Sequence, residues 1–397
     1  MTELYNLSPA IRLMIMGLVV ATGPLAWVWL RNRNAPVVRR LQVLTLVTLF
    51  LTFDLVIFGA FTRLTDSGLG CPDWPGCYGH ASPVGAQLHI ETAQTAMPNG
   101  PVTHSKAWIE MIHRYLATGV GVMILTLTIT TWMERKRVQR HGAGSAQGAA
   151  SFSGQLSPWW PTFTLIWVCL QGAFGALTVT MKLFPAIVTM HLLGGLVLLA
   201  LLKVQSVRYA QARGEQAPVA VNAPLRLLAI VTFVLLWLQI ALGGWVSTNY
   251  AVLACTEFPA CQGSLWPAMD FHQGFTLWRE LGAGRDGVNI SFQALTAIHY
   301  VHRLSAYIVF AATLLLAARL YRLSALRPLA QWLLGLALLQ VATGLGNVLL
   351  GWPMLAAVMH TGGAAALVIV LTGVLLRTRA AREPARASKL SASRLTA

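Results

Sequence analysis

The sequence predicts an all-α polytopic membrane protein: two tandem four-helix bundles in a parallel pseudo-two-fold repeat, plus one extra N-terminal transmembrane helix. Three observations lead to this prediction. The 397 residues are 56% hydrophobic and only 11% charged, whereas soluble domains carry roughly 25% charged residues. Long apolar runs recur along the chain, most of them near the ~20 residues needed to cross a ~30 Å hydrocarbon core. Four short motifs also occur twice, in the same order.

The apolar runs define the predicted spans, and the fifth is the shortest. In lipid a spanning segment must satisfy its own backbone polar groups, so each run is expected to be a helix. The runs cover residues 12–30, 41–61, 107–132, 159–180, 187–202, 225–247, 292–318, 329–350 and 354–376.

The repeated motifs show that spans two to five and six to nine are two copies of one unit. An even number of helices per unit gives both copies the same orientation. The motif pairs are Cys71–Cys77 with Cys255–Cys261, Ile112-His113-Arg114 with Val301-His302-Arg303, Leu170-Gln171 with Leu339-Gln340, and Met190-His191 with Met359-His360.

The repeat divides the chain into four parts. Residues 1–40 are expected to form the extra N-terminal helix and a cytoplasmic turn, and residues 41–210 the first four-helix unit, which contains a linker at 133–158. Residues 211–377 are expected to form the second unit and residues 378–397 a basic cytoplasmic tail.

The net charge of +16 follows the membrane topology. Most Lys and Arg residues lie on alternate connections and in the C-terminal tail. This positive-inside pattern places the C-terminus in the cytoplasm and, with an odd number of spans, the N-terminus in the periplasm. It also argues against a nucleic-acid partner. The segment Met1 to Arg12 has neither a cleaved-signal nor a transit-peptide pattern, so the bacterial inner (plasma) membrane is the simplest location.

Histidines inside the spans are the first candidate site residues: His113, His191, His302 and His360. Ionisable residues inside a membrane are costly and usually functional, although a single one can simply bond two helices. Here two per unit recur at matching positions. At ~1.5 Å per residue, all four are expected within about 10 Å of the outer edge. Each unit can therefore present two imidazoles at one level.

Haem suits such a pair, because haem iron takes axial imidazoles and helical bundles hold such sites. Zinc would need three or four ligands, and no intramembrane cluster of Cys, Asp or Glu supplies them. Arg114 and Arg303 directly follow a histidine. They can pair with haem propionates, or extend to the polar edge of the membrane without a specific partner.

Glu110 distinguishes the two units. It lies three residues before His113, so the two share a helix face, and His299 takes its place in the second unit. This difference suggests a reacting site in the first unit and an electron-transfer site in the second. The alternative is that Glu110 only reaches the headgroup region.

The repeated cysteines lie in the two long outer loops. The outer side of the membrane is oxidising, so Cys71 with Cys77 and Cys255 with Cys261 are expected to form two within-loop disulfides. These can be structural or redox-active. The Cys-x-x-Cys-His motif of covalent haem attachment is absent.

Together these residues resemble the heme A synthase (CtaA) family. The segment from Thr62 to Pro75 is similar to that family's first outer loop. Glu110-Met-Ile-His113-Arg114 resembles its E-x-x-H-R motif, and His299-Tyr-Val-His302-Arg303 resembles the second-unit counterpart. The resemblance covers about 41–377, so the first span is an addition to the family's eight-helix core.

The resemblance implies an oxidoreductase that converts a methyl group of heme O to a formyl group through hydroxylated intermediates, giving heme A for terminal oxidases. It implies that His302 and His360 are the axial ligands of a heme b iron. It also implies that His113 and His191 hold the substrate haem and that Glu110 is catalytic. Expected partners are heme O, membrane lipid, a heme O synthase and a quinone or other electron acceptor; a homo-oligomer is compatible with the sequence.

Two other functions fit part of the pattern. A non-catalytic di-haem b-type cytochrome in quinol electron transfer would explain four histidines but not Glu110. A haem transporter or chaperone would bind haem only transiently.

Overall fold

The computed structural model describes residues 8–141, 157–284 and 289–380. Parts of two predicted segments, residues 142–156 of the linker and 381–397 of the tail, lie outside the described residues.

Nine helices in the described part of the chain are long and apolar enough to cross a membrane. The predicted all-α polytopic fold class is therefore confirmed. These helices are α1 (Ser8–Arg31), α2 (Val37–Leu64), α4 (His104–His141), α6 (Trp159–Thr180), α7 (Pro185–Ala212), α8 (Ala223–Thr248), α10 (Phe292–Tyr321), α11 (Arg327–Leu349) and α12 (Met354–Arg377).

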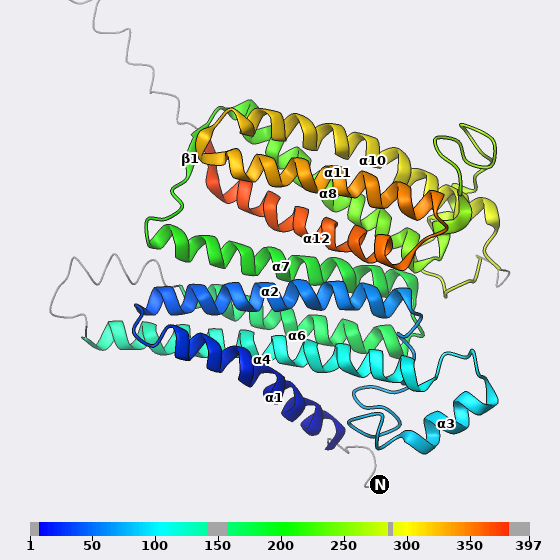
Figure 1. Cartoon of the computed structure of the whole chain (residues 1–397), viewed down its shortest axis with the longest axis horizontal. Coiled ribbons are helices and arrows are strands. Elements are labelled where there is room, and N and C mark those ends of the chain that lie inside the picture. The colour runs from blue at the N-terminus through cyan, green and yellow to red at the C-terminus, as the bar shows by residue number, and fades with distance from the viewer. Residues whose placement is uncertain (1–7, 142–156, 285–288, 381–397) are drawn as a thin grey trace, which may run out of the picture.

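Short elements lie at the two ends of the helix bundle (Figure 1). One end, called the loop end here, carries α3 (Gln87–Ala96), η2 (Ala251–Ala254) and α9 (Phe271–Gly274). The opposite end carries η3 (Ser324–Leu326) and a parallel pair of strands, β1 (Val219–Val221) and β2 (Thr378–Ala380), in which Val219 pairs with Thr378. The strand pair fastens the connection between the two units to the chain after the last helix.

The fifth span is longer than predicted. The apolar run ends at residue 202, but α7 continues to Ala212. Its last turns carry buried polar side chains, among them Gln205, whose amide donates to the Tyr209 hydroxyl over 3.0 Å. Further along, the Gln211 amide donates to the Leu376 carbonyl on α12 over 3.2 Å. Hydropathy alone therefore places the end of α7 too early.

Buried threonines in α2 show how polar side chains are accommodated in a spanning helix. The hydroxyls of Thr45, Thr48 and Thr52 each donate to the carbonyl four residues earlier, over 2.7–2.8 Å. Because each hydroxyl is satisfied within its own helix, α2 can bury these residues without partners on other helices.

The long helices form two bundles that lie against each other (Figure 1). Helices α2, α4, α6 and α7 pack together, as do α8, α10, α11 and α12, while α1 lies against α4. The bundles meet where α2 contacts α12, where α7 contacts α8, and where α7 contacts α12. Helix α2 corresponds to α8 in the repeat, and α7 corresponds to α12. The α2–α12 and α7–α8 contacts are therefore equivalent, as expected for a pseudo-two-fold axis.

Helix α1 approaches α4 closely through glycines. A methyl group at Gly17 would lie 2.6 Å from Cβ of Thr118, and one at Gly119 would lie 3.0 Å from Cγ1 of Val20. Small residues let two helix backbones approach within van der Waals contact, which stabilises helix pairs in lipid. The extra helix is therefore packed specifically on the first bundle.

At the loop end, residues at equivalent positions of the two units contact each other. The Arg63 guanidinium donates to the Ser247 carbonyl over 2.7 Å, and the Tyr250 hydroxyl donates to Asp66 over 2.6 Å. Each contact joins residues 184 positions apart, which is also the spacing from Cys71 to Cys255. Residues on a two-fold axis are expected to meet their own counterparts in this way.

Candidate functional site

The intramembrane histidines come together in two pairs, one in each bundle. His302 on α10 and His360 on α12 have ring centroids 6.5 Å apart. His113 on α4 and His191 on α7 lie close enough to interact electrostatically. Helix α4 begins at His104, earlier than predicted, so His113 lies nine residues inside its helix. Each bundle thus presents two imidazoles from two helices.

A glycine on a neighbouring helix faces each of these four imidazole rings. A Cβ at Gly59 would lie 3.0 Å from Nε2 of His113, and one at Gly243 would lie 2.8 Å from Cε1 of His302. Gly175 and Gly344 stand in the same relation to His191 and His360, at 3.5 and 3.3 Å from Cε1. These glycines occupy matching places in the two units, and they admit the rings between the helices.

The imidazole nitrogens of the two histidine pairs are suitable ligands for haem iron. Each bundle offers two imidazole ligands, the set that a haem iron takes axially. Among the described residues, no cluster of three or more His, Cys, Asp or Glu side chains could hold another metal ion. The buried Nδ1 of His191 has no hydrogen-bond partner, which is unusual for a buried polar atom.

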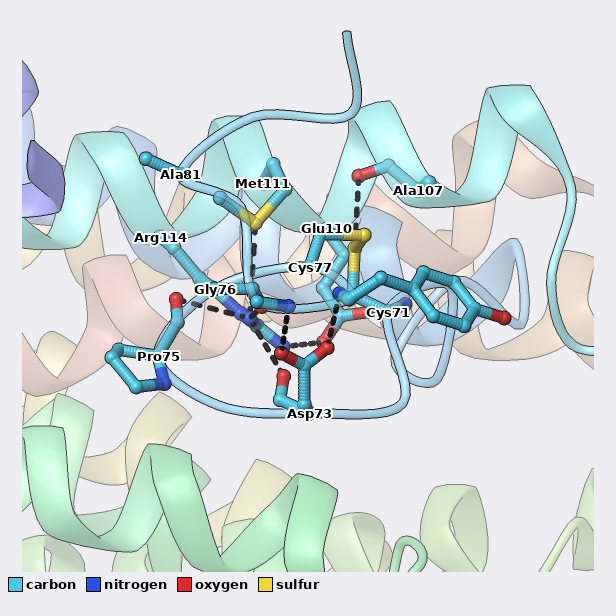
Figure 2. Close-up of a disulfide and its surroundings, with 12 residues drawn as sticks. Cys71, Asp73, Pro75, Gly76, Cys77, Ala81, Ala107, Glu110, Met111 and Arg114 are labelled. Atoms are coloured by element: carbon cyan, nitrogen blue, oxygen red, sulfur yellow. Dashed lines mark hydrogen bonds and ion pairs between the residues drawn. A yellow bond between two sulfur atoms is a disulfide. The ribbon is translucent and has the colours of Figure 1, made fainter. Parts of the chain in front are cut away.

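Glu110 lies on α4 one turn before His113 and points at the first disulfide loop (Figure 2). Its side chain is buried, and it forms a buried ion pair with Arg114. Its other oxygen, Oε2, accepts from the backbone N–H of Cys71 over 2.7 Å. Both carboxylate oxygens therefore have donors, and the carboxylate connects the helix of the first histidine pair to the disulfide loop.

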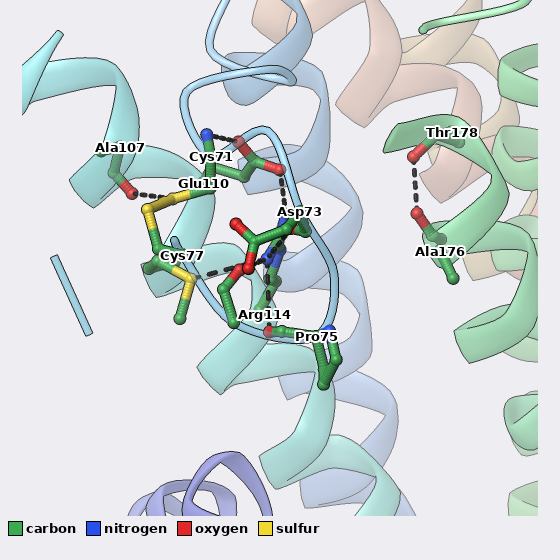
Figure 3. Close-up of polar contacts among 12 residues, drawn as sticks. Cys71, Asp73, Pro75, Cys77, Ala107, Glu110, Arg114, Ala176 and Thr178 are labelled. Atoms are coloured by element: carbon green, nitrogen blue, oxygen red, sulfur yellow. Dashed lines mark hydrogen bonds and ion pairs between the residues drawn. A yellow bond between two sulfur atoms is a disulfide. The ribbon is translucent and has the colours of Figure 1, made fainter. Parts of the chain in front are cut away.

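Arg114 also binds the first disulfide loop. Figure 3 shows the guanidinium among the residues of the turn. It donates to the carbonyl of Asp73 over 3.0 Å and of Pro75 over 3.3 Å, and also to that of Gly76. Since the structure uses Arg114 to hold the loop, a haem propionate would have to replace some of these contacts.

Arg303 differs from Arg114 in one respect. It too is buried and donates to loop carbonyls, those of Pro259 over 3.4 Å and Ala260 over 2.9 Å. Its Nη2, however, is buried without a partner. His299, in the place of Glu110, instead has Nδ1 3.1 Å from the Ala251 carbonyl oxygen. The second unit therefore keeps a free guanidinium nitrogen where the first has an ion pair.

Both predicted disulfides are present. The Cα atoms of Cys71 and Cys77 are 4.9 Å apart, as are those of Cys255 and Cys261. All four cysteines are buried. In the first loop the Asp73 carboxylate also accepts from the Gly79 N–H over 2.8 Å. The two loops are thus built alike, and each lies against the helix that carries a His-Arg pair.

Comparison with known proteins identifies the family. A family model described as COX15-CtaA, cytochrome oxidase assembly protein, matches residues 42–372. The chain belongs to this family. A heme A synthase of Shewanella oneidensis is 38% identical over 333 residues, which are 83% of this chain and 93% of the relative. Heme A synthases of Mesorhizobium japonicum and Methylobacterium radiotolerans are each 28% identical, covering 80% and 85% of this chain and 84% and 90% of the relatives.

The COX15-CtaA match begins after α1 and includes both histidine pairs, Glu110 and both disulfides. The first span thus lies outside the matched core. Within that core, the sequence reasoning missed the four glycines that face the histidines. Gly175 and Gly344 end the repeated segments LQGAFG and LQVATG, so aligning the two units beyond the histidines would have found them.

Sequence reasoning also missed Asp54, a carboxylate within the predicted second span. It is exposed on α2 and lines a cavity of about 130 Å³ between α1, α2 and α4, together with apolar residues such as Leu55 and Leu116. Among the described residues it makes no hydrogen bond or ion pair. Its counterpart in the second unit is Leu238, 53% exposed, so the carboxylate is particular to the first bundle.

Proposed function

We propose that this member of the COX15-CtaA family is a heme A synthase, an oxidoreductase acting on a CH3 group. It oxidises one methyl group of heme O to a formyl group, through hydroxylated intermediates, and yields heme A for terminal oxidases. One observation carries the proposal: two matching histidine pairs are present, and only the first has a buried carboxylate, Glu110, on the same helix face. The chain's similarity to heme A synthases of other bacteria supports it.

The two pairs have different tasks in this proposal. His302 and His360 ligate a resident heme b, which supplies one-electron transfer when bound. His113 and His191 hold the substrate heme O. Oxidation of a methyl to a formyl group removes four electrons, so an acceptor beyond the protein is required, and a quinone is one candidate. In this proposal the two sites lie in adjacent bundles, which supports electron transfer between them.

Glu110 acts at the substrate side. Carboxylates near a reacting group can accept a proton or orient water. Here the carboxylate also joins α4 to the Cys71 loop, so its position depends on that loop. Arg114 holds Glu110 and the loop together and thereby shapes the substrate site. The free Nη2 of Arg303 makes this arginine the better partner for a propionate of heme b.

The proposed location is a bacterial inner membrane. The loop end, with its disulfides, faces the periplasm together with the N-terminus, and the basic end faces the cytoplasm together with the C-terminus. Heme O reaches the site from a heme O synthase in the same membrane.

The test is production of heme A in cells that co-express this chain with a heme O synthase. Extracted haems are separated and identified by mass. The native chain is expected to yield heme A, and Glu110→Gln is expected to reduce it at least about 10²-fold, the lower range for losing a general acid or base. The matched variant His299→Gln changes the corresponding position of the second unit and is expected to retain heme A formation.

A heme b absorption spectrum of purified Glu110→Gln shows whether the variant is folded. Heme b alone from a folded native chain would replace the synthase proposal with a di-haem cytochrome. Unchanged heme A production by Glu110→Gln would remove Glu110 from the mechanism.

A further inference from the structure

The hydrogen bonding of His360 is the starting point. The Thr343 hydroxyl on α11 lies 2.9 Å from Nδ1 of His360 and 2.7 Å from the carbonyl oxygen of Leu339. A hydroxyl has one proton to donate. The Leu339 carbonyl oxygen can only accept a hydrogen bond, whereas Nδ1 of His360 can also donate one when it is protonated. The hydroxyl therefore donates to Leu339 and accepts from Nδ1–H of His360. This fixes the ring tautomer and leaves the Nε2 lone pair free for a metal.

His191, the counterpart of His360, lacks such a partner. The segment LQVATG, which contains Thr343, corresponds to LQGAFG in the first unit, and Phe174 takes the place of the threonine. In agreement with this difference, Nδ1 of His191 is buried and has no hydrogen-bond partner. The tautomer and the angle of this ring are therefore not held by a hydrogen bond.

The other histidine of each pair also has a polar partner only in the second bundle, but here the partner is an amide nitrogen, which donates to Nδ1. The Gln239 amide nitrogen lies 3.1 Å from Nδ1 of His302 and 3.1 Å from its carbonyl oxygen. Ser305, one turn along α10, donates to the amide oxygen and holds the amide in place.

In the first unit both of these positions are apolar. Leu55 corresponds to Gln239 and Leu116 to Ser305. His113 stacks on Phe58, with ring centroids 6.3 Å apart, and makes no hydrogen bond within the described part of the chain. Each histidine of the second bundle therefore has a polar partner at Nδ1, whereas apolar residues take the place of those partners in the first bundle.

We propose that the hydrogen bond between Thr343 and His360 makes the haem of the second bundle the resident one, with Thr343 as its positioning residue. The apolar surroundings of His113 and His191 leave the first bundle with exchangeable ligands, so that substrate haem can enter and product haem can leave. The inference rests on the proposed function, because it assigns one haem to each bundle. Partners of this kind, one shell beyond the ligands, change metal affinity by about 10–100-fold when removed.

A second consequence concerns the redox potential. A hydrogen bond from Nδ1–H to an oxygen raises the basicity of the ligating imidazole, and a more basic ligand favours ferric over ferrous iron. Loss of the Thr343 bond therefore raises the midpoint potential of the heme b. A tenfold loss of preference for ferric iron corresponds to 59 mV for a one-electron couple.

The experiment compares full-length native protein with Thr343→Val and Thr343→Ser, each purified with its haem in detergent. Haem loss is followed by transfer to excess apomyoglobin, and the midpoint potential by spectroelectrochemical titration. We expect Thr343→Val, which keeps the shape of threonine, to release heme b about 10–100-fold faster and at a higher potential. Thr343→Ser restores the hydroxyl and is expected to behave like the native chain.

A reciprocal variant tests the first bundle. Phe174→Thr introduces a hydroxyl opposite His191 and is expected to slow release of heme O about 10-fold, with the heme b of the second bundle unchanged. Equal haem-release rates and potentials for Thr343→Val and native protein would overturn the inference while leaving the synthase proposal intact. A folded native chain that binds no haem at the second bundle would instead overturn the proposed function.

Discussion

Gly243 offers the sharpest test of how closely the helices enclose the proposed heme b ligands. An alanine Cβ at this position would lie 2.8 Å from Cε1 of His302, and 3.4 and 3.5 Å from its Nδ1 and Nε2. Ordinary contact begins at 3.4 Å, so the ring must move by about 0.6 Å in a packed interior that resists such shifts. The movement is larger than the roughly 0.5 Å tolerance of a ligand set.

Two energies oppose each other in Gly243→Ala. Overpacking costs about 1–3 kcal/mol, and replacing glycine by alanine inside a helix contributes about 1 kcal/mol in favour of the variant. The fold is therefore expected to lose no more than about 2 kcal/mol. The ligand displacement acts separately on the haem, and we expect heme b affinity to fall at least about 10-fold.

Gly344→Ala is the matched control, because Gly344 faces His360, the other proposed ligand of the same haem. Its Cβ would lie 3.3 Å from Cε1 of His360, only about 0.1 Å inside ordinary contact. Heme b per protein is measured by the pyridine hemochrome method across a titration of added haem. Equal heme b affinity in the two variants would refute the argument that the glycine at 243 determines the position of the His302 ring.

Further predictions follow from the same structure. Arg114→Gln leaves Glu110 as a buried unpaired carboxylate and should lower the unfolding free energy by about 3–5 kcal/mol; adding Glu110→Gln should recover part of this loss in detergent unfolding, and a purely additive cycle would contradict it. Burial raises the pKa of Tyr250 above 10.0. Its stabilising contribution is therefore complete below pH 10 and is lost as the pH rises through the raised pKa. The alkaline fall of the melting temperature should accordingly be smaller in Tyr250→Phe, and identical alkaline profiles would count against it. Gly17→Leu should separate α1 from Thr118 on α4 and expose residues 8–31 to proteolysis, while the heme b spectrum persists.

The fold class and the histidine pairs were predictable because they depend on local or repeated patterns. Apolar length sets which segments cross a membrane, and all nine helices were found at the predicted places. The spacing of Cys71 and Cys77 within one loop likewise predicted their disulfide, since six residues of separation keep the sulfurs close in any tight turn.

The ends of the helices were predictable only where the apolar run ends with the helix. Helix α12 does so within one residue. Helix α7 does not, because its last turns are polar, and Gln211 there bonds to the Leu376 carbonyl of α12. The bonds of Arg114 to loop carbonyls about forty residues away were not predicted, and its role at a haem propionate stays a prediction. Contacts at that separation depend on how the loop folds back on α4.

The sequence by itself determined the membrane setting, the duplication and the residue types that can hold two haems, because hydropathy and repeated motifs are properties of order along the chain. Tertiary structure decided which polar groups meet. Thr343 and His360 lie on different helices, as do Gly243 and His302. Whether such residues touch is set by the rotation and separation of packed helices. That packing gives the histidines of two similar bundles different polar surroundings.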